Sequence, residues 1–210
     1  MAGERMTSTE IWLRLMHTGS LCGDVMVEAA ARLQRQDGID TLVLRNAGLT
    51  AKQAERFVAL NESELERSLI WLEQPGHHLL TANHPLYPPL LRTIPDYPGA
   101  LFIKGNPETL NTVQLAVVGS RAPSWYGERG GKSLCEQLSQ SGFTITSGLA
   151  CGIDGVAHSA ALSVKGRSVA VLGNGLFSIY PRRHQALAMR LIESDGAIVS
   201  EFPPSAQPRP

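Results

Sequence analysis

The hydrophobic pattern divides the chain into three parts with different periodicities. Residues 1–75 repeat apolar positions at the helical spacing, for example Leu65, Leu69 and Leu72, and predict a small all-helical domain. Prolines crowd the next segment, up to residue 113, so it cannot form a long helix. From Leu115 onward, short runs rich in β-branched residues alternate with helical patterns, which is typical of parallel βαβ units.

Capping signals support the helices of the first part. Thr7 and Thr50 each precede a Glu or Gln by three residues, the spacing of a capping box, and Thr7 opens the helix Ile11–His17. Asp24 is expected to cap a second helix, and Asn61 to open the last one. The segment RNAGLTAKQAERF resembles half of a helix-hairpin-helix element, which can bind DNA backbones. Packing or protein contact is the more common role of such a pair.

The α/β part predicts a Rossmann-like parallel sheet with flanking helices. The strand-like runs HHLLT and ALFIKG lie between prolines, and we expect them to extend one border of this sheet. The later strands stop at four small-residue turns: Gly119-Ser120-Arg121, Ser147-Gly148, Gly173-Asn174-Gly175 and Ser200-Glu201. Ligands of such sheets bind at the carboxyl ends of the strands, so we expect the site at these turns. The expected domains are residues 1–75 and 76–210.

Composition and charge narrow the class of protein. The chain has 43% hydrophobic and 18% charged residues, and no apolar run approaches the length of a membrane span. It also has no secretory-type start, so a cytoplasmic location is expected. Net charge is zero, but residues 1–75 hold 8 Lys and Arg against 11 Asp and Glu, and the remainder holds 11 against 8. This small asymmetry permits a basic patch for nucleic acid.

Motif tests remove several ligand classes. The first βα turn carries one glycine instead of GxGxxG, Ser178 takes the third glycine position after Gly173 and Gly175, and no GxxxxGK[ST] loop exists. Three scattered cysteines and the pair His77-His78 do not form a metal set, so neither cofactor nor metal is expected. The remaining features of the strand-end turns suit a phosphate ligand. They are the glycines, the helix N-termini and the guanidinium of Arg121.

The second helix of this part carries polar residues beside its apolar stripe. At about 100° per residue, Asp154, His158 and Lys165 fall on one side, so Asp154 could orient His158 and Lys165 could border the crevice. A dipole-stabilised Asp and a half-buried His explain the first two equally well.

Aromatic and cationic residues gather near the same edge. Trp125, Tyr126, Phe177 and Tyr180 follow the strand ends, and Arg182 and Arg183 are among the nearby cations. Single-stranded nucleic acid is bound by such a combination. Core packing is the alternative for Tyr180.

Four ordered motifs carry a family resemblance: VVGSR followed by WYG, then SGLACGIDGVAHSAAL, AVLGNGLFSIYP and SEFPP. Over roughly residues 80–204 the chain resembles the DNA-processing protein A family, also called Smf or DprA, and its helical N-terminus resembles that family's sterile-alpha-motif-like domain. The resemblance implies an extended Rossmann-like domain that binds single-stranded DNA, forms homodimers, loads RecA recombinase and protects DNA during natural transformation. It implies no chemistry on DNA.

The resemblance also implies which residues contact nucleic acid. Carried over by position, they are Gly119, Ser120, Arg121, Ser147, Gly148, Gly152, Lys165 or Arg167, Gly173 and Gly175. Phe177 and His184 stand where many members carry Asp and Asn, so this loop departs from the family pattern. The family's sheet continues past SEFPP with a basic FPxRNR segment, a helix and further strands. We therefore expect a fragment or truncated form with weak DNA binding, without the dimer and RecA surfaces.

Two other functions remain open. Rossmann-like relatives include nucleotide phosphoribohydrolases, which cleave an N-glycosidic bond; in this chain Glu201 is the one carboxylate at a strand end, and GNGLFS is not their PGGxGT loop. A pure protein-interaction scaffold is the third hypothesis.

Overall fold

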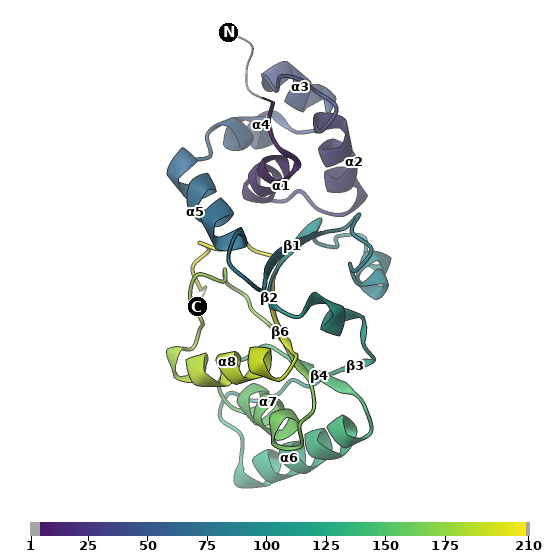
Figure 1. Cartoon of the computed structure of the whole chain (residues 1–210), viewed down its shortest axis with the longest axis vertical. Coiled ribbons are helices and arrows are strands. Elements are labelled where there is room, and N and C mark those ends of the chain that lie inside the picture. The colour runs from purple at the N-terminus through teal and green to yellow at the C-terminus, as the bar shows by residue number, and fades with distance from the viewer. Residues whose placement is uncertain (1–4, 209–210) are drawn as a thin grey trace. The chain divides into compact units, whose positions relative to one another are not determined.

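The computed structural model describes residues 5–208, and these residues form two compact units (Figure 1). The first unit comprises the chain up to residue 75 together with residues 79–101, and the second comprises residues 76–78 and the chain from residue 102. A domain boundary at residue 75 stays a prediction. Each unit is described by itself.

The first unit is helical, as its periodicity predicted. It contains α1 (Ser8–His17), α2 (Gly23–Leu33), α3 (Thr41–Asn46), α4 (Ala51–Val58) and α5 (Glu62–Leu72). Both capping boxes are confirmed. The side chains of Thr7 and Thr50 each accept a hydrogen bond from the backbone N–H three residues on, and the side chain of Glu10 or Gln53 at that position accepts one from the backbone N–H of the capping residue. The N-cap role of Asn61 is also confirmed.

The pair α3 and α4 serves packing. Gly48, with φ of 106°, makes the turn between the two helices. Leu44, Leu49, Ala54 and Phe57 are all buried in the core of this unit. The apolar residues of the RNAGLTAKQAERF segment are therefore used inside the unit, which agrees with the packing role.

The prediction for Asp24 is wrong. The N-cap of α2 is Cys22, which makes no side-chain capping bond, and the helix begins at Gly23. The carboxylate of Asp24 instead accepts a hydrogen bond of 2.7 Å from the hydroxyl of Tyr97. Tyr97 belongs to the proline-rich segment, whose Ala100 joins the helical core. This segment packs on α2, so long-range contacts decide the role of Asp24.

A six-stranded mixed sheet runs through the second part of the chain in the order β1-β2-β6-β5-β4-β3. Its strands are β1 (His77–Thr81), β2 (Ala100–Gly105), β3 (Gln114–Ala116), β4 (Thr144–Ser147), β5 (Ser168–Val171) and β6 (Ala197–Ser200). The last four pair in parallel, and β2 pairs antiparallel with β6. The parallel sheet with two strands added at one border is thus confirmed.

Three helices connect the parallel strands: α6 (Trp125–Gln140), α7 (Ile153–Ser163) and α8 (Gln185–Glu193). Since consecutive strands are neighbours and such crossovers are right-handed, the helices share one face of the sheet. α7 contacts both α6 and α8, and Figure 1 shows it between them. Short 3₁₀ turns occur at Pro89–Thr93, Pro107–Asn111 and Arg182–His184. No helix in residues 5–208 combines the length and apolarity that a membrane span requires.

A buried histidine lies between α7 and the sheet. The hydroxyl of Ser168 donates to the carbonyl of Ile145 at 2.6 Å, so His158 Nδ1, 2.7 Å from the same hydroxyl oxygen, must donate to it. His158 Nε2 is buried and has no hydrogen-bond partner among the described residues. Burial, followed by the proximity of His184, lowers the pKa of His158 to about 4.

This histidine makes stability depend on pH. The unfolded chain binds a proton below the ordinary pKa of 6.5, whereas the folded chain resists it down to about 4. Stability should therefore fall as the pH decreases through this window, by up to about 3 kcal/mol. Urea unfolding midpoints measured between about pH 7 and pH 4 should fall less steeply for His158→Gln than for the parent. The exposed His84→Gln control should keep the parental slope, and equal slopes for all three proteins would contradict this assignment.

Candidate nucleic-acid interface

A small cavity lies at the carboxyl edge of the parallel strands, where the turns following β3, β4 and β5 meet. Its volume is about 170 Å³. The lining residues are Arg121, Gly148, Ala150, Cys151, Leu172, Gly173, Asn174, Tyr180, Pro181 and Pro208. Three of the predicted site residues, Arg121, Gly148 and Gly173, are among them. The cavity therefore lies where the strand-end argument placed the site.

Arg121 is the one charged side chain of the described lining. It lies on the turn that follows β3, and its side chain is exposed. Within residues 5–208, neither a hydrogen-bond acceptor nor a carboxylate is recorded for its guanidinium. The hydroxyl of the neighbouring Ser120, also exposed, accepts from the Ala122 N–H at 3.1 Å and keeps its own proton to donate. An anion at this turn would meet a free guanidinium beside a free hydroxyl donor.

A close backbone approach fixes this turn against the start of α7. Gly152 has φ of 83° and is the N-cap of the helix. A Cβ on Gly152 would collide with the carbonyl oxygen of Ser120 and lie 2.8 Å from Cα of Arg121. The Ile153 N–H donates to the same carbonyl at 3.1 Å, and a Cβ on Gly119 would strike the Ile153 side chain at 2.7 Å. Gly119 and Gly152 thus hold the turn in place by permitting close packing.

The second turn is built around a buried carboxylate. Ser147 is buried, and its hydroxyl donates to the carbonyl of Val117 at 2.6 Å, joining β4 to the end of β3. The N–H groups of Gly148 and Ala150 both donate to Oδ2 of Asp154 at 3.2 Å. Asp154 therefore holds this loop, and the amide of Gly148, a predicted contact residue, already has an internal acceptor, as does the amide of Ala150.

The third turn offers open space at its first glycine only. A Cβ on Gly173 would meet no atom within 4 Å, whereas one on Gly175 would collide with the backbone of Pro203 and Pro204. Asn174 is buried, and its amide donates to the carbonyls of Gly175 and Ser178 at 2.8 and 3.0 Å. Gly175 and Asn174 thus shape the turn, and Gly173 faces the cavity.

Two predicted residues lie away from the cavity. Lys165 and Arg167 stand just before β5, at the opposite edge of the sheet from Gly173. The idea that Lys165 continues the polar side of the helix is wrong, because α7 ends at Ser163 and Lys165 adopts φ of 59°. Arg167 Nη1 lies 3.9 Å from Oδ2 of Asp195. The proposed contact between Asp154 and His158 is also absent from the recorded hydrogen bonds, since each bonds elsewhere.

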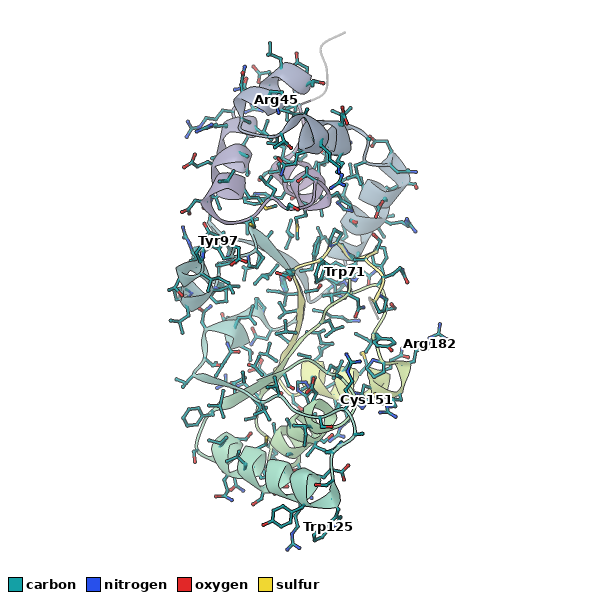
Figure 2. The ribbon with its side chains drawn as sticks, turned by 180° about the vertical axis from the view of Figure 1, so that it is seen from behind. Arg45, Trp71, Tyr97, Trp125, Cys151 and Arg182 are labelled. Atoms are coloured by element: carbon teal, nitrogen blue, oxygen red, sulfur yellow. The ribbon has the colours of Figure 1, made fainter. Side chains whose placement is uncertain are left out.

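The aromatic residues behave differently from one another. Tyr180 lines the cavity with 58% of its surface exposed, so the core-packing alternative is wrong. Trp125 and Tyr126 are exposed on the first turn of α6, and the Arg129 guanidinium lies 5.4 Å from the Trp125 ring centroid. Figure 2 shows Arg182, two residues after Tyr180, extending from the ribbon. Tyr180 thus offers a ring for stacking beside the cationic turn.

Sequence reasoning missed part of the lining. Ala150, Cys151 and Pro181 line the cavity although no motif marked them, and only their positions next to Gly148, Gly152 and Tyr180 could have indicated it. Within the described lining there is no carboxylate, and Glu201 is not part of it. The cavity consequently holds no side chain suited to general acid or base catalysis by a carboxylate.

Comparisons with known proteins show the family of this chain and its fold. Residues 78–210 match the model of the family described as DNA recombination-mediator protein A, and residues 6–70 match the SMF/DprA SAM domain. The chain belongs to the DprA/Smf family. It is 58% identical over 203 residues to Protein Smf of Escherichia coli, covering 97% of this chain and 54% of that relative. It is 33% identical over 167 residues to DNA processing protein DprA of Bacillus subtilis, covering 77% and 56%. The chain thus spans about half the length of these two DprA/Smf relatives.

Solved structures of DprA share the fold. The protein from Streptococcus pneumoniae matches with a TM-score of 0.76 at 28% identity, covering 98% of this chain and 71% of that one. A Helicobacter pylori structure, described as giving insight into the unique single-stranded DNA binding mode of DprA, matches with a TM-score of 0.56 at 26% identity. The match covers 63% of this chain and 59% of the Helicobacter pylori chain. The helical domain followed by a Rossmann-like sheet is therefore that of DprA.

The close packing at Gly152 is open to test. Gly152→Ala should lower stability by roughly 2–4 kcal/mol, since a side chain is strained at this φ and collides with the backbone of the Arg121 turn. Gly130→Ala is the matched control: no atom lies within 4 Å of its added Cβ, so alanine in the α6 interior should stabilise by about 0.5–1 kcal/mol. Urea unfolding measures both changes. A Gly152→Ala protein as stable as the parent would contradict the close approach.

Proposed function

We propose that this chain binds single-stranded DNA at the Arg121 cavity, as part of a DprA protein that acts in DNA processing and recombination. One observation carries the proposal: Arg121 has an exposed guanidinium without a hydrogen-bond or carboxylate partner within residues 5–208, beside a cavity lined mainly by small residues and an exposed tyrosine ring. Arginine binds phosphate oxygens through two parallel hydrogen bonds, and aromatic rings stack on unpaired bases. The Helicobacter pylori DprA structure, described by its single-stranded DNA binding mode, adds support.

The wider role follows from the family. We propose that the protein protects single-stranded DNA, loads RecA onto it and serves natural transformation, working as a homodimer in the cytoplasm. These parts of the proposal concern the whole DprA protein. They rest on the family and not on a surface identified in this chain.

We further propose that the protein performs no chemistry on DNA. The described lining of the cavity contains no carboxylate, which leaves the phosphoribohydrolase alternative without its acid or base at this site. Incubation with nucleoside monophosphates should therefore release no free base. Release that disappears in Glu201→Gln would overturn this part of the proposal.

The role of Arg121 can be measured directly. Arg121→Ala should weaken binding of a single-stranded oligonucleotide and reduce the slope of log K against log salt by about one, because one phosphate contact is lost. Arg35→Ala, which removes an exposed arginine of the helical unit, is the matched control and should change neither quantity. Fluorescence anisotropy over a salt series measures both. Parental affinity and slope in Arg121→Ala would remove the basis of the proposal.

The open space at Gly173 gives an independent test. Gly173→Leu should fill the cavity and lower oligonucleotide affinity at least tenfold, a loss of about 1.4 kcal/mol, while the urea midpoint stays close to the parental value. Stability is expected to hold because a Cβ at this position meets no atom within 4 Å and Gly173 is not among the positive-φ glycines. Full affinity with a filled cavity would show that DNA binds elsewhere.

A further inference from the structure

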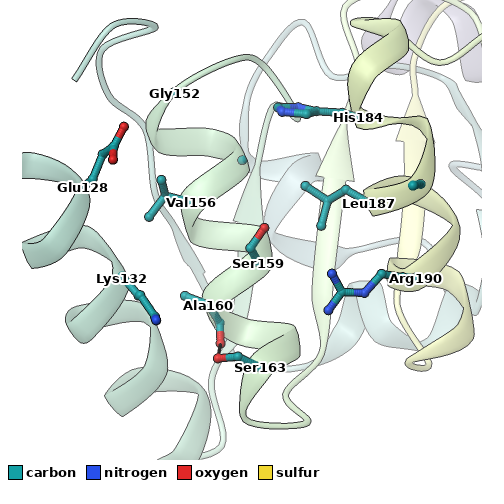
Figure 3. A pocket seen from close by; sticks show the side chains of 12 residues that line it. Glu128, Lys132, Gly152, Val156, Ser159, Ala160, Ser163, His184, Leu187 and Arg190 are labelled. Carbon is teal, nitrogen blue, oxygen red and sulfur yellow. Dashed lines mark hydrogen bonds between the residues drawn. The ribbon is translucent and has the colours of Figure 1, made fainter. Parts of the chain in front are cut away.

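A larger groove runs along the helical layer beside the Arg121 turn. Its volume is about 570 Å³, and it lies over α7 between α6 and α8 (Figure 3). α7 forms the floor with small or short side chains at helical spacing: Gly152, Gly155, Val156, Ser159, Ala160 and Ser163. Because these side chains are short, a chain lying in the groove can approach the helix backbone closely.

Cations from both walls face each other across this floor. In Figure 3, Lys132 of α6 and Arg190 of α8 extend toward α7 from opposite sides, near Ser159 and Ser163. Lys132 Nζ lies 3.8 Å from Glu136 Oε1, a loose contact. No carboxylate partner is recorded for Arg190 in the part of the chain that the structure describes. Lys132 is thus loosely paired with Glu136, whereas Arg190 faces the groove without a carboxylate partner among the described residues.

The groove begins at the Arg121 turn. Gly152 lines its upper end and is in close contact with the backbone of Ser120 and Arg121. His184 also lines this end and follows Pro181, a residue of the smaller cavity. The eleven residues of α7 extend about 16 Å from there, and Lys165 stands two residues beyond the last helical residue. The helix therefore runs from the turn of Arg121 at one edge of the sheet toward Lys165 and Arg167 at the other edge, and all three are cations that the sequence predicted for the site.

We propose that this groove binds the continuation of the single-stranded DNA held at Arg121, with its phosphodiester backbone between Lys132 and Arg190. The inference rests on the proposed function. Lys132 and Arg190 outnumber the single lining carboxylate, Glu128, and the exposed Ser159 hydroxyl of the floor can donate to a phosphate oxygen. The Ser163 hydroxyl instead donates to the Ala160 carbonyl at 2.7 Å. A protein partner is the less suitable occupant, because the described lining has no Trp or Tyr anchor on which binding energy between proteins concentrates, whereas contact with a phosphodiester backbone requires cations and hydroxyl donors only.

Oligonucleotides of two lengths test this path. The double variant Lys132→Ala, Arg190→Ala should bind an oligonucleotide of about 16 nucleotides at least tenfold more weakly, with a salt slope smaller by about 1.4 because two phosphate contacts are lost. Its affinity for one of about 4 nucleotides, long enough for the Arg121 cavity alone, should stay parental. Lys52→Ala, Arg35→Ala, an exposed pair on the helical unit, is the matched control and should leave both affinities unchanged.

A substitution on the floor of the groove tests the same DNA path by adding a negative charge instead of removing positive ones. Ser159→Glu adds a negative charge at an exposed position between the two cations and should also weaken only the longer oligonucleotide. Unchanged affinity and slope for the longer oligonucleotide in both variants would overturn the proposal and leave the groove to an acidic protein segment. Equal losses for both lengths would also overturn it. If the Arg121→Ala protein binds both lengths with parental affinity, the proposed DNA binding at Arg121 is contradicted, and this result does not depend on the groove.

Discussion

The close approach between Gly152 and the backbone of Ser120 and Arg121 is the constraint on which the site depends. It joins the turn after β3 to the first residue of α7, and the 3.1 Å bond from Ile153 to Ser120 completes the junction. Arg121 lines the cavity and Gly152 lines the groove, so the shape of both depends on this junction. A larger residue at position 152 would separate the cationic turn from the helix that follows it.

Some hydroxyls and amides around this junction form hydrogen bonds inside the protein, and others remain exposed where a ligand can reach them. Ser147 joins two strand ends, and Ser200 donates to the carbonyl of Asn174 at 2.7 Å, so both are occupied inside the protein. Ser120 and Arg121 remain exposed and available. Three of the four turns carry a serine, and burial separates Ser147 and Ser200, which join parts of the sheet, from Ser120, which can reach a ligand.

Local patterns predicted most of the fold, because periodicity and caps are local properties. The strands, the capping boxes at Thr7 and Thr50 and the addition of HHLLT and ALFIKG at one border of the sheet follow from local sequence signals. The error at Asp24 arose because a distant contact decides its role, and the error at Lys165 because the helix ends earlier than its period suggested. Asp24 bonds Tyr97, 73 residues away in sequence. Lys165 left the expected helix face because α7 stops at Ser163, where the Gly166 N–H bonds the Ala161 carbonyl at 2.9 Å.

The buried carboxylate of Asp154 has a kinetic consequence. It occupies the amides of Gly148 and Ala150, so a phosphate near this loop gains little from them and also meets a negative charge behind them. Attraction then comes mainly from mobile side chains such as Arg121, which salt and competing polyanions screen readily. In the proposed complex with single-stranded DNA, such a site would release each phosphate readily. A single strand bound in the proposed way could then be displaced stepwise, without unfolding the site.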